Sequence, residues 1–261
     1  MQVDLENKVA LVTGAARGIG QAIAQSFAQN GARVVFADLD EGLAHAAAQN
    51  AGNNSFGLRL DVSRESEVEN GVARVLQECG RLDILVNNAG INTMKKRVTI
   101  DEFSLEEWNR VLSVDLTGLF LMSRAAVRPM LEAKSGRVIN IASIAGLVPL
   151  RLQSAFVAAK AGVVNLTKSM AIELGGRGVL CNAIAPGSIL TDATRAVFYG
   201  EDGDFSQNAQ QLIDHIPLAR PGHPEEVAAA ALFLAAPESS YVNGHVLVVD
   251  GGWTAGYTRD F

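Results

Sequence analysis

The chain has 261 residues, of which 48% are hydrophobic and 19% are charged, and it carries a formal net charge of −6 with a pI near 5.3. This length and apolar content suit one well-buried domain. The acidic balance argues against a nucleic-acid or an anionic-membrane partner, because both favour a basic protein surface.

Neither a metal site nor a membrane or secretory segment is expected. The two cysteines, Cys79 and Cys181, form no CxxC motif or Cys/His cluster, so no metal is predicted. Acidic residues precede the first apolar run of segment 1–14, unlike in a signal peptide, and no apolar run approaches the ~20 residues of a membrane helix. We therefore expect a soluble, cytoplasmic protein.

Short apolar runs alternate with helical patterns along the whole chain. Runs of nearly continuous Val, Ile, Leu and Ala are typical of parallel strands buried on both faces. Strand–helix alternation is the signature of a doubly wound sheet. The sequence therefore predicts a single α/β domain over 1–261, a parallel sheet of seven strands with helices on both faces. The expected strands are 8–14, 33–39, 55–62, 82–90, 136–143, 179–187 and 245–252, and the expected helices are 19–30, 41–50, 65–80, 104–134 and 154–175.

One long irregular stretch, 188–222, interrupts this alternation. Long loops in compact domains usually serve as lids or binding loops. We expect this segment to be a substrate lid.

A glycine-rich stretch, TGAARGIG at 13–20, follows the first expected strand and opens the first expected helix. Gly14 permits the tight turn, and Gly18 and Gly20 let backbone and phosphate approach closely. The pyrophosphate of a dinucleotide would sit at the helix N-terminus, where N–H groups and the helix dipole favour an anion. Asp38, an acid at the end of the second strand, completes the context that such a site requires.

The choice of dinucleotide depends on two residues of opposite charge. The Asp38 carboxylate would accept hydrogen bonds from the adenosine ribose and would repel a 2′-phosphate, which carries about −1.5 to −2 charges. Arg17 could receive that phosphate, or it is a solvated loop arginine. Asp40 and Glu41 add negative charge to the same corner. The sequence therefore predicts NAD rather than NADP.

Further motifs follow in chain order: Asp61-Val62, NNAG at 87–90, IAS ending at Ser143, Pro186-Gly187 followed by Thr191, PLARPGHPEEVA at 217–228 and VVDGG at 248–252. With the glycine loop they resemble the markers of the short-chain dehydrogenase/reductase family, single-domain type, over nearly the whole chain. The resemblance implies a Rossmann-type fold and an oxidoreductase. The cofactor-binding residues it implies are Gly14, Arg17, Gly18, Ile19, Gly20, Asp38, Leu39, Asp61, Val62, Asn88, Ala89, Gly90, Lys160, Pro186, Gly187, Ile189 and Thr191.

The resemblance also implies the chemistry. In this family a serine polarises the substrate oxygen, a tyrosine passes its proton, a lysine lowers the tyrosine's pKa and holds the nicotinamide ribose, and an asparagine extends a proton relay. The serine is Ser143 and the lysine is Lys160, but Phe156 takes the tyrosine's place and Asp115 the asparagine's. Phe156 has no proton to give, and losing a general acid typically costs roughly 10²–10⁴-fold in rate. Asp115 can still accept a hydrogen bond from relay water.

Phe156 admits three interpretations: an ordinary core aromatic, a natural change in a binding-only protein, or a Tyr→Phe substitution that traps bound ligand. Because Ser143, Lys160 and the glycine loop are intact, a single missing oxygen atom favours the last, an inactivated variant of an enzyme. A catalytically silent NAD(H)-binding sensor or scaffold protein is the alternative.

The expected pocket segments, 91–98, 144–155 and the lid, say less about the substrate. Arg151 and Gln153 face either the pocket or solvent. If they point inward, the substrate is small and polar, with an anionic end that Arg can grip. The chain then resembles the family branch that interconverts secondary alcohols and ketones of polyols, sugars and 2-keto-3-deoxy sugar acids, with Ser143, Arg151 and Gln153 at the substrate.

The long helices also suggest an assembly. Segments 116–122 and 161–174 carry more apolar positions than one core-facing stripe requires, and exposed patches of that kind usually mark interfaces. The family resemblance implies a homotetramer with two-fold axes through these helices and the last strand, and a tail, 251–261, that packs at a subunit interface.

Overall fold

The computed structural model describes residues 3–93, 97–192, 194–195 and 206–256. Within these residues the strands form one seven-stranded sheet in the order β3-β2-β1-β4-β5-β6-β7, and every neighbouring pair is parallel. This confirms the predicted sheet. The strands are β1 (Val9–Thr13), β2 (Arg33–Asp38), β3 (Phe56–Arg59), β4 (Ile84–Asn87), β5 (Gly136–Ile141), β6 (Val179–Pro186) and β7 (Val246–Val249).

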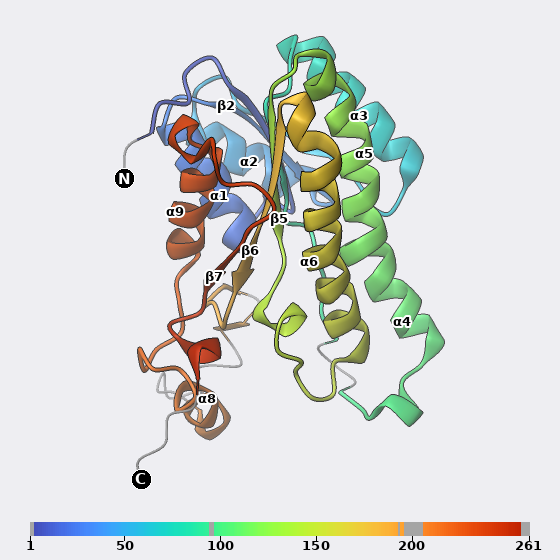
Figure 1. The fold of residues 1–261 in the computed structure, drawn as a ribbon, viewed down its shortest axis with the longest axis vertical. Coiled ribbons are helices and arrows are strands. Elements are labelled where there is room, and N and C mark those ends of the chain that lie inside the picture. Colours follow the sequence, from blue (N-terminus) through green and yellow to red (C-terminus); the bar gives the residue numbers. More distant parts are fainter. Residues whose placement is uncertain (1–2, 94–96, 193, 196–205, 257–261) are drawn as a thin grey trace.

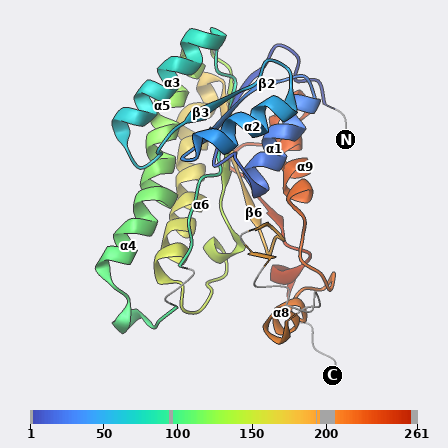
Figure 2. The ribbon, with the colours of Figure 1, turned by 180° about the vertical axis from the view of Figure 1, so that it is seen from behind.

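Helices cover both faces of the sheet, as Figure 1 and the reverse view in Figure 2 show. One layer holds α1, α2 and α9, and the other holds α3, α5 and α6. The helices are α1 (Gly18–Gln29), α2 (Glu41–Ala51), α3 (Glu65–Cys79), α4 (Leu105–Leu112), α5 (Leu119–Glu132), α6 (Ser154–Leu174), α8 (Gln207–Ile213) and α9 (Pro224–Ala235).

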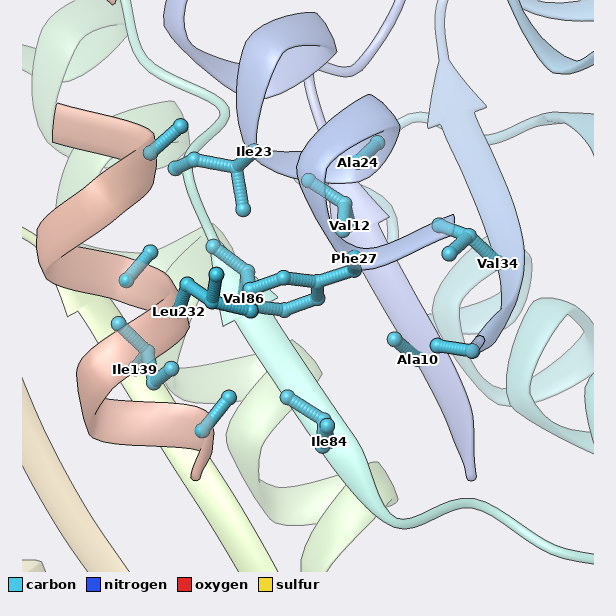
Figure 3. Close-up of a cluster of buried hydrophobic side chains, with 14 of the residues drawn as sticks. Ala10, Val12, Ile23, Ala24, Phe27, Val34, Ile84, Val86, Ile139 and Leu232 are labelled. Atoms are coloured by element: carbon cyan, nitrogen blue, oxygen red, sulfur yellow. The ribbon is translucent and has the colours of Figure 1, made fainter. Parts of the chain in front are cut away.

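The strands are apolar throughout because each one is buried on both sides. Along β1, Ala10 and Val12 belong to the core beneath α1 and α9, whereas Val9 and Leu11 belong to the core beneath α3 and α5. Successive side chains of a strand point to opposite faces, so an unbroken apolar run serves two helical layers. Figure 3 shows the first core, where the fully buried ring of Phe27 lies among side chains of the strands and of α9.

The predicted long helix 104–134 is interrupted by a wide π-type turn. The turn, η2 (Ser113–Gly118), joins α4 to α5 without breaking the rod. The turn packs closely against Val62 in the loop that follows β3. A Cβ atom on Gly118 would lie only 2.8 Å from Cγ2 of Val62. Turns of this kind change the direction of single side chains and are frequent at functional sites.

Part of the segment after β6, which the sequence predicts to be irregular, is helical. Within the predicted lid 188–222, Gln207–Ile213 form α8, which lies beyond the carboxyl edge of the sheet (Figure 1). Residues 193 and 196–205 of the predicted lid, 94–96 of the predicted pocket and 257–261 of the predicted tail lie outside the described residues. Helix α9 was not predicted at all.

Most of the apolar positions cited for an interface are buried within the chain itself. Leu119, Leu121 and Met122 of α5 and Val163 of α6 are core residues. The same helices still expose Phe120 and Ile172, and the edge strand β7 exposes Val248. In the described part of the chain, no helix combines the length and apolarity needed to cross a membrane.

Candidate active site

The site forms where the chain order of the sheet reverses. β1 and β4 are neighbours at the centre of the sheet. After β1 the chain continues to β2 on one side, and after β4 it continues to β5 on the other side. In open α/β sheets the crevice at the carboxyl ends of such strands is where ligands bind. The glycine loop leads from β1 into α1 at this point, with positive φ at Gly14 (63°) and Gly18 (58°), a conformation that favours glycine.

Gly20 is enclosed by backbone and side-chain atoms of the glycine loop and of the NNAG segment. A Cβ at Gly20 would lie 2.2 Å from the Gly14 carbonyl oxygen and 2.4 Å from Nδ2 of Asn88. Close packing inside the protein therefore requires glycine at this position. Asn88 Nδ2 donates to the carbonyls of Thr13 (2.9 Å) and Gly14 (3.0 Å), and the Asn88 and Ala89 amides donate to the Thr13 hydroxyl. The NNAG segment thus fixes the shape of the glycine loop.

Asp38 stands beside this loop at the end of β2. Its Oδ2 accepts from the Ala16 amide (3.0 Å) and its Oδ1 from the Asp40 amide (3.2 Å). A carboxylate has about four acceptor sites, so two bonds leave capacity for ribose hydroxyls. Arg17 is exposed, and Leu39 is 61% exposed. The carboxylate is held in place while the basic residue faces solvent.

Of the other predicted cofactor segments, the one that follows β6 lies beside the glycine loop. A Cβ on Gly18 would lie 3.4 Å from the Thr191 methyl group, so the segment after β6 reaches the glycine loop. Ile189 pairs with Gly222 in an isolated bridge that closes the base of the predicted lid. Pro186 is the last residue of β6, and the amide of Gly187 donates to the Val249 carbonyl. Ile19 is half-buried against the core. Asp61 accepts hydrogen bonds from Ser63, and the next residue, Val62, is buried.

Ser143, Phe156 and Lys160 come from β5's end and from α6. The Ser143 oxygen accepts from the Ala145 amide (3.1 Å), so its own proton stays available for a substrate oxygen. Lys160 is 6% exposed, its Nζ donates to the Ile141 carbonyl (3.2 Å), and it lies 5.6 Å from the centroid of the Phe156 ring. The half-buried phenyl ring and the buried ammonium group are therefore neighbours on one face of α6.

Asp115 lies in the π-type turn η2 and contacts Lys160 directly, without an intervening water. Its Oδ1 accepts from the Ile91 amide (2.7 Å), and its Oδ2 lies 3.2 Å from Lys160 Nζ. The second contact is an ion pair by distance, but among the described residues no aligned hydrogen bond reaches Oδ2. Asp115 is 1% exposed, so a buried acceptor with spare capacity points into the site.

The two predicted substrate residues Gln153 and Arg151 differ in their exposure to solvent. Gln153 is buried, and its Oε1 accepts from Nδ2 of Asn92 (3.0 Å), whereas Arg151 is exposed. Asn92 was not predicted individually, although it belongs to the predicted pocket segment 91–98. Its position two residues after NNAG, where the chain leaves the carboxyl end of β4, was the signal that could have identified it.

The arrangement fits a dinucleotide. It combines an unobstructed glycine turn at a helix start, a fixed carboxylate beside it and a buried ammonium at the far end of the crevice. Within the described ranges, no group of three or more His, Cys, Asp or Glu side chains could hold a metal ion.

Comparisons with known proteins agree with this geometry. The family model described as enoyl-(acyl carrier protein) reductase matches residues 14–254. The 3-oxoacyl-[acyl-carrier-protein] reductase FabG of Vibrio harveyi is 42% identical over 250 residues, which cover 96% of this chain and 98% of that protein. The D-threitol dehydrogenase of Mycolicibacterium smegmatis is 42% identical over 253 residues, covering 96% and 94%.

A solved structure gives the same result in three dimensions. The crystal structure of gox2181 is similar to this chain with a TM-score of 0.91 at 36% identity, covering 97% of this chain and 98% of that one. Sequence motifs, sheet order and full-length relatives thus agree on an oxidoreductase that acts on a small molecule. The chain belongs to the short-chain dehydrogenase/reductase family.

Proposed function

We propose that this oxidoreductase interconverts a secondary alcohol and a ketone on a small polar substrate with NAD, and that Phe156 leaves it nearly inactive. The position of Phe156 supports this proposal most strongly. The centroid of its ring lies 5.6 Å from the Lys160 ammonium, and Ser143 and Lys160 are both present. A bound nicotinamide would supply or accept the hydride.

The side chains of the cluster would then divide the remaining work. Ser143 donates a hydrogen bond to the substrate oxygen and polarises it, and Lys160 holds the nicotinamide ribose. The oxygen must also gain or lose a proton, and Phe156 has no group that can carry one. Proton transfer by a positioned side chain is worth roughly 10²–10⁴-fold in rate, which is the size of the expected deficit.

NAD is proposed as the cofactor because of the fixed Asp38 carboxylate. Two backbone amides hold it beside the glycine loop, where it would repel a 2′-phosphate. Arg17, the residue that could favour NADP, is exposed.

A polar substrate is supported by Gln153 and Asn92. A partly buried amide pair at the site would favour a ligand hydroxyl over a bare hydrocarbon, since an unpaired polar group in a dry site costs free energy. The relative named D-threitol dehydrogenase agrees with this class. We propose that segment 188–222 covers the substrate. Arg151, being exposed, gives no support to a grip on an anionic end.

Reduction of a 3-oxoacyl thioester is the second candidate, because the FabG of Vibrio harveyi is as similar to this chain as the threitol enzyme is. The test is Phe156→Tyr, assayed with NAD(H) on polyols, sugar acids and 3-oxoacyl thioesters, with Phe156→Tyr/Ser143→Ala as the control. Turnover on a polyol or sugar acid supports the first candidate, and turnover on a thioester alone supports the second. Absence of turnover on all of them leaves the NAD(H)-binding sensor.

A homotetramer is also proposed. The exposed apolar side chains of α5 and α6 lie on one helical layer, and Val248 lies on the edge strand β7, which gives two separate contact surfaces. Two such surfaces allow an assembly with more than one kind of two-fold axis.

A further inference from the structure

The Lys160–Asp115 pair is a buried pair of opposite charges. The side chains are 7% and 0% exposed, and Nζ and Oδ2 are 3.2 Å apart. Each partner is also held by the backbone, Lys160 by the Ile141 carbonyl and Asp115 by the Ile91 amide. Because water screens buried charges weakly, each charge acts at longer range here than at the surface.

The pair lies directly under the backbone of Gly90, at the edge of the crevice. A Cβ on Gly90 would come within 3.1 Å of Asp115 Oδ2 and 3.3 Å of Lys160 Nζ. Gly90 itself is exposed, so a single backbone segment separates the two charges from whatever occupies the crevice. Both charges therefore act on the same bound group.

The two forms of a nicotinamide differ by one positive charge, because the oxidised ring is a cation and the reduced ring is neutral. A lone Lys160 ammonium would disfavour the cation relative to the neutral form. The family pattern has a neutral asparagine where this chain has Asp115. The negative charge of the Asp115 carboxylate offsets the positive charge of the Lys160 ammonium 3.2 Å away.

We propose that Asp115 acts as the counter-charge of Lys160 and shifts the binding preference of the site toward the oxidised dinucleotide. This inference rests on the proposed NAD site. It makes Asp115 a positioning and charge-compensating residue, distinct from an acceptor for relay water.

The test is the ratio of the dissociation constants for NAD and NADH, measured by calorimetry in the protein as it stands and in Asp115→Asn. The asparagine oxygen can still accept from the Ile91 amide, so the variant removes the charge with little change of shape. The expected result is a loss of NAD affinity relative to NADH on the order of ten-fold, the scale of one partly screened charge.

Asp83→Asn is the matched control. It removes the same charge from another buried carboxylate, at the amino edge of the sheet, which pairs with the more exposed side chains of Arg81 and Lys8, and it should leave the ratio unchanged. If Asp115→Asn weakens both dinucleotides equally, or changes the ratio by less than about two-fold, the inference is wrong while the proposed function stands. If neither dinucleotide binds the protein as it stands, both are overturned.

Discussion

The preference for NAD over NADP is proposed to depend on one residue, Asp38, whose carboxylate lies beside the glycine loop. Replacing it with Ser or Ala removes the charge that opposes a 2′-phosphate, so the advantage of NAD over NADP should narrow by about ten-fold or more. Titration of both dinucleotides into each protein measures the change. Glu41→Gln, which removes a charge from the same corner but no contact to the glycine loop, should have a much smaller effect. Equal affinities before any substitution would mean that Arg17 outweighs Asp38.

The sequence could propose which residues form the candidate site, but it could not predict their contacts. The family resemblance singled out Ser143, Phe156 and Lys160, and the structure places Lys160 beside Phe156 and beside Ile141 of β5, the strand that leads to Ser143. The ion pair of Asp115 with Lys160 depends on a π-type turn that adds one residue to a helical turn. Hydrophobic periodicity does not reveal such an insertion, because the apolar pattern continues on both sides of it.

At the scale of elements, the start of α9 is held by a polar contact with a defined pH dependence. Glu226 accepts from the His223 amide (2.8 Å) and pairs with Arg220 (2.7 Å). The hydrogen bond from Arg220, followed by that from the His223 amide, lowers the pKa of Glu226 to about 2. A lowered pKa in the folded state stabilises the protein above the ordinary carboxyl pKa, and that contribution is lost as pH falls toward 2.

Glu226→Gln should therefore lower the melting temperature at pH 7, and the gap should close as pH falls from about 5 toward 2. The effect should be small, a few degrees at most, because both side chains are more than a third exposed and solvent screens the pair. Thermal unfolding across this pH range is the measurement. Glu225→Gln, in the same helical turn, leaves the Arg220 contact intact and should show no such convergence; a gap that persists at low pH would contradict the assignment.

Helix α9 itself shows a signal that was present and not used. Pro224 stands at the first helical position, two acidic residues follow it, and the run to Ala235 is long enough for a helix. Its nearly continuous apolar composition hides the helical period, because both α1 and the sheet cover it (Figure 3). The motif at 217–228 overlaps the start of this helix.

At the scale of the whole molecule, the exposed apolar side chains predict an assembly. Light scattering at micromolar concentration should give the mass of a tetramer. Ile172→Glu places a charge on the α5–α6 surface, where Ile172 is 85% exposed, and should reduce the mass to that of a smaller species without unfolding the chain. Leu43→Glu, on the opposite helical layer, should leave the mass unchanged. A monomeric mass for the original protein would refute the assembly.

Phe156 is proposed to separate NAD binding from turnover. No contact of Lys160 or Asp115 passes through a tyrosine hydroxyl, so the NAD site should be complete without one. The direct measurement is calorimetric titration of NAD into the protein as it stands and into Phe156→Tyr, alongside turnover on the substrate found in the panel. The account predicts equal NAD affinity and a kcat that is roughly 10²–10⁴-fold higher in Phe156→Tyr. NAD binding that is about ten-fold weaker in the protein as it stands, a difference of about 1.4 kcal/mol, would contradict it, because the site would then be distorted and not merely silenced.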